Sequence, residues 1–196
     1  MNHVWFYEQW KNIQLQDVKD ILLSLSEDIP CVGDISVRDI CCLAKNPYTP
    51  VGLYTFIEDN EVLYAGKTHG RSLHERLLSH LDHRDPSGAG PHLAQFAQSI
   101  LKSGDVTTSE AAVQKILDMK MIWLPVPMTQ NDFGVHKKVI ASIERRLLWN
   151  KCLDPKYNSE RVKRNDYFTI KGKRYSLSTD MILGETSGIV SGELGL

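Results

Sequence analysis

The stretch that decides the fold is Val51-Gly-Leu-Tyr-Thr-Phe-Ile57, followed by a polar Glu-Asp-Asn turn and then by Glu61-Val-Leu-Tyr-Ala-Gly66. Two short apolar runs rich in β-branched and aromatic residues, joined by a short polar turn, are typical of a β-hairpin. A third apolar run, from Met121 to Val126, ends among prolines and predicts one more strand. We therefore expect a small sheet of three strands at the centre of the molecule.

Helical patterns surround these strands. Apolar residues from Leu15 to Leu25 recur at helical spacing, and Ser72 is a candidate N-cap for a helix that carries Leu73, Leu77 and Leu81. Further helices are expected over residues 34–44, 92–101, 109–117 and 134–150. The predicted fold class is α/β, of the α+β kind, with a three-stranded mixed or antiparallel sheet flanked by helices.

Breaks in these patterns suggest three parts. Residues 1–46 form an N-terminal helical appendage that ends at a proline-rich breaker, and residues 47–160 form the core. Residues 161–196 hold a basic β-hairpin over 167–177 and then a Gly/Ser-spaced tail that we expect to be loosely ordered.

Size and composition fit a soluble globular protein. The 196 residues suggest one domain with some elaboration, with 42% hydrophobic and 24% charged residues. No apolar run is long enough for a transmembrane helix, and the first residues do not resemble a signal peptide, so we expect a cytoplasmic protein with no membrane partner. The four cysteines lack zinc-site spacing and are interpreted as free thiols.

The charge is unevenly distributed along a chain whose net charge is −1. Residues 1–62 hold 4 Lys/Arg and 10 Asp/Glu, whereas residues 136–174 hold 12 Lys/Arg and 4 Asp/Glu. A basic segment of this kind is expected of a surface that contacts phosphates. Basic runs on helices are also common as solvated faces, so charge alone leaves both interpretations open.

Glu144 is the most informative single residue. In the helix expected over 134–150, the carboxylate lies beside the apolar stripe that contains Ile140, Ile143 and Leu148. A carboxylate against the core is unfavourable unless it is paired or binds a metal ion. A structural salt bridge to an arginine is the alternative.

Arg76 and His80 are four residues apart, so they share one face of the helix after the hairpin. A guanidinium at the edge of the core suits bidentate phosphate binding, although an idle surface pair has the same spacing. Tyr54 and Tyr64 lie on the paired strands, where tyrosine is common. Lys67 ends the second strand within an Ala-Gly-Lys-Thr string, but this string is no P-loop, because Glu61 stands where that motif needs glycine.

Together these residues resemble the GIY-YIG nuclease family. The Gly-Leu-Tyr that ends at Tyr54 is similar to the GIY element, and the Tyr-Ala-Gly that begins at Tyr64 is similar to the YIG element. Arg76 to His80 resembles the family's R-x-x-x-H helix, and Glu144 resembles its metal-binding glutamate. Asn158 occupies the place of an asparagine that follows that glutamate helix in the family.

These five elements occur in the family's order over about residues 50–160. Leu53 and Ala65 replace isoleucines of the motifs, both at apolar strand positions. The long interval between Arg76 and Glu144 implies an insertion around residues 84–118 of the GIY-YIG core.

The resemblance implies a single-metal mechanism. Glu144 would bind one Mg²⁺ or Mn²⁺, and Arg76 would hold the scissile phosphate. Tyr54 would take the proton of the attacking water, with its pKa lowered by Lys67, Arg76 and the metal ion. Tyr64 and His80 would orient the water and the phosphate, with His80 as the rival general base. Asn158 would support the site through hydrogen bonds.

The short chain, with a lysine after the YIG-like element and Arg71 just beyond, looks like the restriction branch of the family. We therefore expect a Type II restriction endonuclease that cuts double-stranded DNA at a short site as a homodimer, with a DNA methyltransferase as a possible companion. The loop 84–91 and the basic C-terminal segment are candidates for base readout. The DNA contacts expected are Lys67, Arg71, Arg76, Arg161, Lys163, Arg164, Lys171, Lys173 and Arg174. The alternatives are a structure-selective or non-specific nuclease acting on DNA or RNA, and an inactive DNA-binding module.

Overall fold

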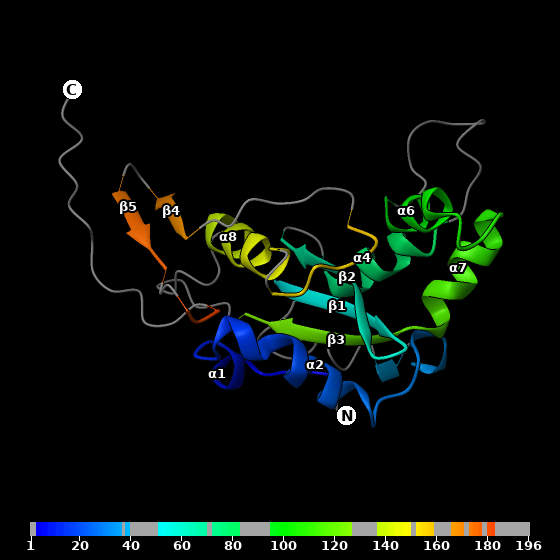
Figure 1. Cartoon of the computed structure of the whole chain (residues 1–196), viewed down its shortest axis with the longest axis horizontal. Helices are drawn as coiled ribbons and strands as arrows, with labels where there is room; N and C mark the ends of the chain where they lie inside the picture. The colour runs from blue at the N-terminus through cyan, green and yellow to red at the C-terminus, as the bar shows by residue number, and fades with distance from the viewer. Residues whose placement is uncertain are drawn as a thin grey trace.

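A computed structural model describes residues 3–36, 38–39, 51–69, 72–82, 95–126, 137–149, 152–158, 166–170, 173–177 and 180–182. Its centre is a three-stranded sheet of β1 (Gly52–Glu58), β2 (Glu61–Thr68) and β3 (Lys120–Pro125), in the order β2-β1-β3. Both strand pairs are antiparallel, so the expected three-stranded sheet is confirmed in its antiparallel form (Figure 1).

The turn between β1 and β2 explains why these two strands pair so closely. Asp59 and Asn60 have φ angles of 49° and 61°, both in the left-handed region. Two consecutive left-handed residues are typical of the type I′ turn, whose twist matches that of a hairpin, and Asp and Asn tolerate this conformation. The resulting register places Tyr54 opposite Gly66.

Six α-helices surround the sheet in the described part of the chain. They are α1 (Tyr7–Trp10), α2 (Val18–Ser26), α4 (Leu73–His80), α6 (Gln95–Ser103), α7 (Ser109–Asp118) and α8 (Lys137–Leu147). A small hairpin, β4 (Tyr167–Ile170) with β5 (Lys173–Ser176), packs against α8 at the opposite end of the molecule from α6 and α7 (Figure 1). The mixed α/β class and the C-terminal hairpin therefore agree with the sequence.

One helix differs from its expectation. A helix is expected from residue 34 to residue 44, but Asp34 instead ends a short 3-10 helix (Val32–Asp34). Helical backbone reappears at residues 38–39, and residues 40–44 lie outside the described part. The backbone N–H of Val32 is bound to the carbonyl of Met119, so a tertiary contact sets the conformation here.

The sheet separates two hydrophobic clusters because side chains alternate along β1. Leu53 and Ile57 belong to the first cluster, which also holds apolar residues of α2 and α8. Tyr54 and Phe56 belong to the second, together with residues of α4, α6 and α7. Helix α8, which carries Glu144, and helix α4, which carries Arg76, are therefore on opposite sides of the sheet.

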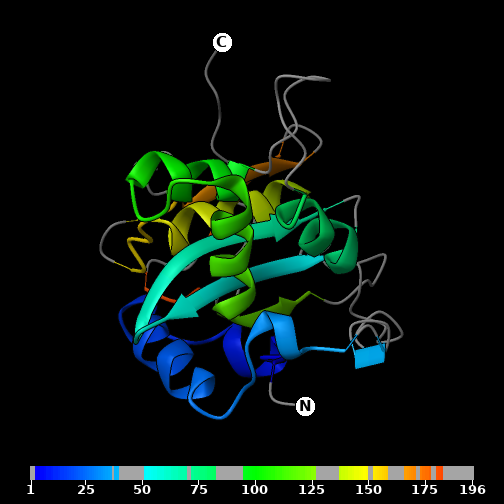
Figure 2. The same cartoon turned by 90° about the vertical axis from the view of Figure 1, so that its right-hand side faces the viewer.

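The N-terminal region packs directly on the sheet. Val4 forms a parallel bridge with Trp123 of β3, and α2 contacts β3. Figure 2 shows α1 and α2 in blue on one side of the strands. The backbone N–H of Ile182 donates to the carbonyl of Ile13 at 2.8 Å, so a C-terminal segment closes over this layer. Among the described helices, none is long and apolar enough to span a membrane.

Candidate active site

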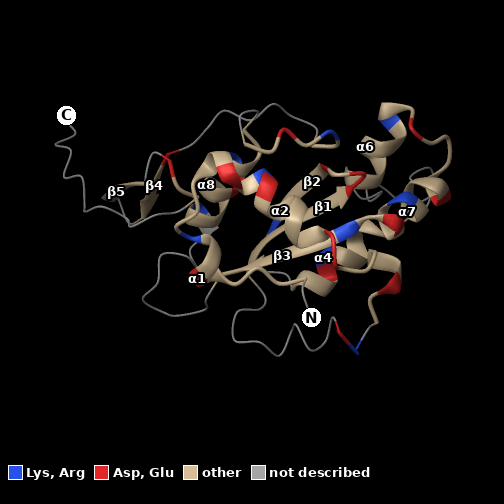
Figure 3. Ribbon diagram, turned by 60° about the horizontal axis from the view of Figure 1, so that its bottom comes forward, with Lys and Arg blue, Asp and Glu red and all other residues tan. Residues whose placement is uncertain are grey.

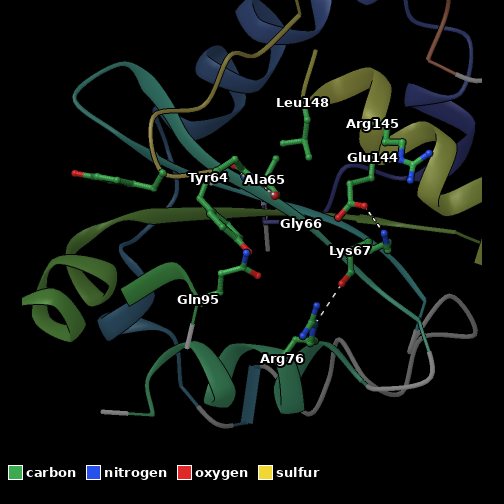
Figure 4. A pocket seen from close by; sticks show the side chains of 11 residues that line it. Tyr64, Ala65, Gly66, Lys67, Arg76, Gln95, Glu144, Arg145 and Leu148 are labelled. Carbon is green, nitrogen blue, oxygen red and sulfur yellow. Dashed lines mark hydrogen bonds and ion pairs between the residues drawn. The ribbon is translucent and has the colours of Figure 1, made fainter. Parts of the chain in front are cut away.

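A pocket of about 400 Å³ lies along β2, where side chains from both layers of helices meet (Figure 4). Strand β2 is an edge strand of the sheet, so α4 and α6 reach it from one side and α8 from the other. The residues that line the pocket are Tyr64, Ala65, Gly66, Lys67, Arg76, Gln95, Glu144, Arg145, Leu148, Tyr157 and Asn158. The group contains five of the seven residues that the sequence suggested for catalysis.

Glu144 and Lys67 form an ion pair across this pocket. The Glu144 side chain is 17% exposed and belongs to α8, whereas the Lys67 side chain is 34% exposed and belongs to β2. The sequence left open whether Glu144 is paired or binds a metal ion, and in the protein alone it is paired with a lysine. Because both side chains line an open pocket, the carboxylate remains accessible to a small cation from solvent.

Arg76 reaches the pocket from the middle of α4. This helix begins with a capping box in which the Ser72 side chain accepts from the backbone N–H of Glu75 and the Glu75 carboxylate accepts from the backbone N–H of Ser72. The cap fixes where the helix starts and therefore which residues face β2. The Arg76 Nε contacts the carbonyl oxygen of Lys67 at 3.4 Å, a long hydrogen bond that leaves most of the guanidinium donors for a ligand.

Tyr54 and His80 lie directly behind the pocket. The Tyr54 hydroxyl is 2.7 Å from Nε2 of His80, and its ring packs at 6.3 Å from the ring of Tyr64. Tyr54 is 1% exposed and does not line the pocket, whereas Tyr64 does. Gly66 lines the pocket and lies directly against Tyr54, because a Cβ added at Gly66 would lie 2.5 Å from the Tyr54 hydroxyl.

Burial controls the protonation of this tyrosine–histidine pair. Desolvation by burial raises the pKa of Tyr54 well above its usual value, and the opposing effect of Arg76 is smaller. Burial, with a further contribution from Arg76, lowers the pKa of His80 to about 3. The expected lowering by Arg76 is present, but desolvation outweighs it, so the net shift in the pKa of Tyr54 is upward in the protein alone. Both side chains are neutral near pH 7.

Asn158 binds the backbone of β2 rather than another side chain. Its Oδ1 accepts from the N–H of Ala65 at 2.9 Å, and its Nδ2 donates to the carbonyl of the same residue at 2.8 Å. The backbone N–H of Tyr157 donates to the carbonyl of Leu63 at 2.9 Å. These bonds satisfy the free edge of β2 and hold the Tyr-Ala-Gly segment beside the pocket.

Of the other expected DNA contacts, the structure describes the side chain of Arg174, and that side chain does not line the pocket. The guanidinium of Arg174 lies 3.8 Å from the centre of the Tyr167 ring, on the β4–β5 hairpin. Lys173 is the first residue of β5. The remaining expected contacts lie outside the described residues: Arg71, Arg161, Lys163, Arg164 and Lys171.

Sequence reasoning missed four pocket residues: Gln95, Arg145, Leu148 and Tyr157. Two of them could have been found from the sequence, because Arg145 and Tyr157 are direct neighbours of the predicted site residues Glu144 and Asn158. No sequence pattern pointed to Gln95, since its helix α6 belongs to the segment interpreted as an insertion. Tyr157 is also held from that segment, because its hydroxyl donates to the Asp105 carboxylate at 2.5 Å.

The donor set of the pocket suits one divalent cation only in part. No group of three or more His, Cys, Asp or Glu gathers at a potential metal site among the described residues. Glu144 is the one carboxylate among the residues that line the pocket. Mg²⁺ commonly binds through one or two carboxylates and completes its shell with water and substrate phosphates. Glu144 beside an open, polar pocket fits that mode of binding.

Comparison with known proteins adds no relative. No family model, no curated protein and no solved structure matches the chain. The motifs in the sequence and the geometry of the pocket are therefore what indicates the function.

Proposed function

We propose that the protein is a metal-dependent GIY-YIG nuclease that hydrolyses phosphodiester bonds in double-stranded DNA. The observation that carries the proposal is the convergence of Glu144 and Arg76, which are far apart in the sequence and on opposite layers of the fold, on one pocket beside β2. Lys67, Tyr64 and Asn158 meet them there, and Tyr54 and His80 lie behind. Chance motif matches at five separate places would not be expected to converge.

Each side chain has a role that follows from its place. The Arg76 guanidinium binds the non-bridging oxygens of the scissile phosphate. Glu144 binds the divalent cation, which when bound stabilises negative charge on the phosphate and lowers the pKa of the attacking water. Lys67 must then release Glu144, and its ammonium becomes available to the phosphate. Asn158 keeps β2 in place.

The proton of the attacking water passes to the Tyr54–His80 pair. Tyr54 is buried beside the pocket, so it would take this proton only when the loaded site brings the water against its hydroxyl, while its own phenol proton moves to Nε2 of His80, which lies 2.7 Å away. In the protein alone this transfer is unfavourable, because both groups are held neutral by burial. A bound cation would lower the pKa of the attacking water and so make the water a stronger proton donor to the pair. Proton transfer therefore depends on a site that holds both the cation and the DNA.

Cleavage of supercoiled plasmid DNA in the presence of Mg²⁺ tests the proposal. We expect nicked and linear products from the wild-type protein and a loss on the order of 10²–10³-fold in Glu144→Ala. Glu61→Ala, which removes an exposed carboxylate at the hairpin turn, is the matched control and should cut normally. Cleavage by Glu144→Ala at the wild-type rate would contradict the proposal.

The finer proposal is a Type II restriction endonuclease that acts as a homodimer on a short, twofold-symmetric site. Long linear DNA digested to completion should then give discrete bands whose ends share one sequence. A smear of fragments would instead support a non-specific or structure-selective nuclease, and preferential degradation of RNA would support a ribonuclease.

A further inference from the structure

Arg145 is a pocket residue to which the proposed mechanism gives no role. It follows Glu144 on α8 and lines the same pocket, as Figure 4 shows. Figure 3 shows basic positions beside the acidic one on this helix. Arg145 is exposed, and within the described part of the chain no hydrogen bond or ion pair is recorded for it. Its guanidinium is therefore available to a ligand.

The next residue shows that this is not a general property of α8. Arg146 is fully buried, donates to the carbonyl of Ile182 at 3.1 Å and lies 3.3 Å from the Asp166 carboxylate. Two consecutive arginines on one helix point about 100° apart. One of them anchors the C-terminal segment, and the other faces the pocket.

The charges of the pocket indicate what this arginine binds. Three cations line it, namely Lys67, Arg76 and Arg145, against the single carboxylate of Glu144. In the metal-free protein Lys67 and Glu144 neutralise each other, so two guanidiniums remain. A phosphodiester carries one negative charge, and a guanidinium binds its oxygens through paired hydrogen bonds. The excess charge thus matches two backbone phosphates rather than one.

The two arginines reach the pocket from opposite layers of the fold. Arg76 comes from α4 and Arg145 from α8, and these helices cover opposite sides of the sheet. Figure 4 shows Arg76 and Arg145 on either side of Lys67. A chain of phosphates that passes along β2 would meet the two guanidiniums in succession.

We propose that the pocket binds one DNA strand at two backbone phosphates, with the scissile phosphate on Arg76 and a second, uncut phosphate on Arg145. The inference rests on the proposed function and adds a substrate-positioning site to it. It implies that the preferred substrate is a polynucleotide strand and not an isolated phosphodiester.

The number of phosphate contacts can be measured from the salt dependence of DNA binding. Binding to a short duplex labelled with a fluorophore is measured by anisotropy in EDTA, so that no cleavage occurs, over a series of salt concentrations. Each phosphate contact contributes about 0.9 to the slope of log K against log salt. Arg145→Gln should lower the magnitude of the slope by about 0.9 and weaken binding several-fold, while Arg145→Lys should keep the slope.

The double variant distinguishes two phosphates from one. If Arg76 and Arg145 hold different phosphates, Arg76→Gln/Arg145→Gln should lose about twice the slope of either single variant. A double variant equal to a single one overturns the two-phosphate proposal, and so does an unchanged slope in Arg145→Gln. Circular dichroism should give wild-type unfolding for Arg145→Gln, because the side chain is exposed.

Arg38→Gln is the matched control, because Arg38 is exposed, lies in the N-terminal region and does not line the pocket. It should bind with the wild-type slope, and an equal loss in Arg38→Gln and Arg145→Gln would mean that net charge alone acts, which overturns the site. The nuclease proposal fails separately: it fails if Glu144→Ala cuts as the wild type does, whatever the slopes are.

Discussion

Gly66 lies opposite Tyr54 in the β1–β2 pair, and its missing side chain leaves room for the tyrosine ring. A Cβ at Gly66 would lie 2.5 Å from the Tyr54 hydroxyl and 2.6 Å from Cζ, closer than such atoms approach in proteins. The glycine of the YIG-like element therefore has a physical reason in this chain. A glycine at this position affects both where the Tyr54 phenol lies and how stable strand β2 is.

Gly66→Ala should accordingly destabilise the protein by about 1–3 kcal/mol, because the ring or the strand must move to admit a methyl group. Urea unfolding measures this change in the free energy of unfolding. Gly33→Ala is the matched control, since a Cβ at Gly33 would meet only Leu117, at 3.4 Å, and should change stability little. Equal stabilities of the two variants would contradict this account of Gly66.

His80 should make stability depend on pH. Its pKa is lowered to about 3 by burial, with Arg76 acting in the same direction, whereas an unfolded chain has a histidine pKa of about 6.5. Between these values the unfolded state binds more protons, so stability falls as the pH falls. From pH 7 to pH 5 the contribution of His80 to this fall should be about 2 kcal/mol.

Urea unfolding at pH 7 and pH 5, for the wild type and His80→Gln, isolates this contribution. The variant should lose less stability than the wild type between the two pH values, because the other titrating groups are common to both proteins. The same loss in both proteins would show that the imidazole is not held neutral by the fold.

At the scale of elements, the ion pair between β2 and α8 would compete with the proposed metal ion for Glu144. Lys67 supplies the positive charge next to Glu144 in the protein alone, so a divalent cation must displace it. A partly exposed ion pair contributes about 1 kcal/mol, which corresponds to about a fivefold effect on a competing equilibrium.

Lys67→Met should therefore bind Mn²⁺ about fivefold more tightly in the absence of DNA, as measured by electron paramagnetic resonance of the free ion. The same variant should cut DNA more slowly, because the ammonium no longer reaches the phosphate. Lys115→Met is a close control, since Lys115 pairs with Glu58 at similar exposures of 24% and 21% but outside the pocket. Unchanged or weaker Mn²⁺ binding in Lys67→Met would refute the competition.

The segment after α8 acts as a clamp on the free edge of β2. Asn158→Ala removes both bonds to Ala65 and leaves the N–H and C=O of this buried residue without these partners. We expect a loss of about 1–3 kcal/mol in the free energy of unfolding and faster hydrogen exchange of the Ala65 amide. Asn12→Ala, at an exposed position, should leave both quantities unchanged. Wild-type protection of the Ala65 amide in Asn158→Ala would contradict the clamp.

At the scale of the whole molecule, the N-terminal helices and the sheet should unfold together. Trp10 lies in the cluster that joins α1 and α2 to the sheet, and Trp123 lies in the cluster on the other side. In a variant that keeps Trp10 or Trp123 as its single tryptophan, fluorescence and far-ultraviolet circular dichroism should change at the same urea concentration. Separate midpoints would mean that the N-terminal region is an independent unit.

The sequence alone determined the elements and the candidate residues. The two apolar runs between Val51 and Gly66 and the Asp-Asn turn predict the hairpin, and Ser72 predicts the start of α4. These signals act between residues that are neighbours along the chain. The motifs also singled out Glu144 and Arg76 before any contact was known. Such local patterns predict strands and helices, since each has its own short period along the chain.

Only the tertiary structure decided which of these residues meet and in what state. Helices from two layers pack around one edge strand. This packing pairs Lys67 with Glu144, brings Arg145 to the pocket and buries Tyr54 against Gly66. The raised pKa of Tyr54 has the same origin, because desolvation is a property of the surroundings and not of the residue. Contacts between distant segments have no period along the chain, so no sequence pattern encodes them directly.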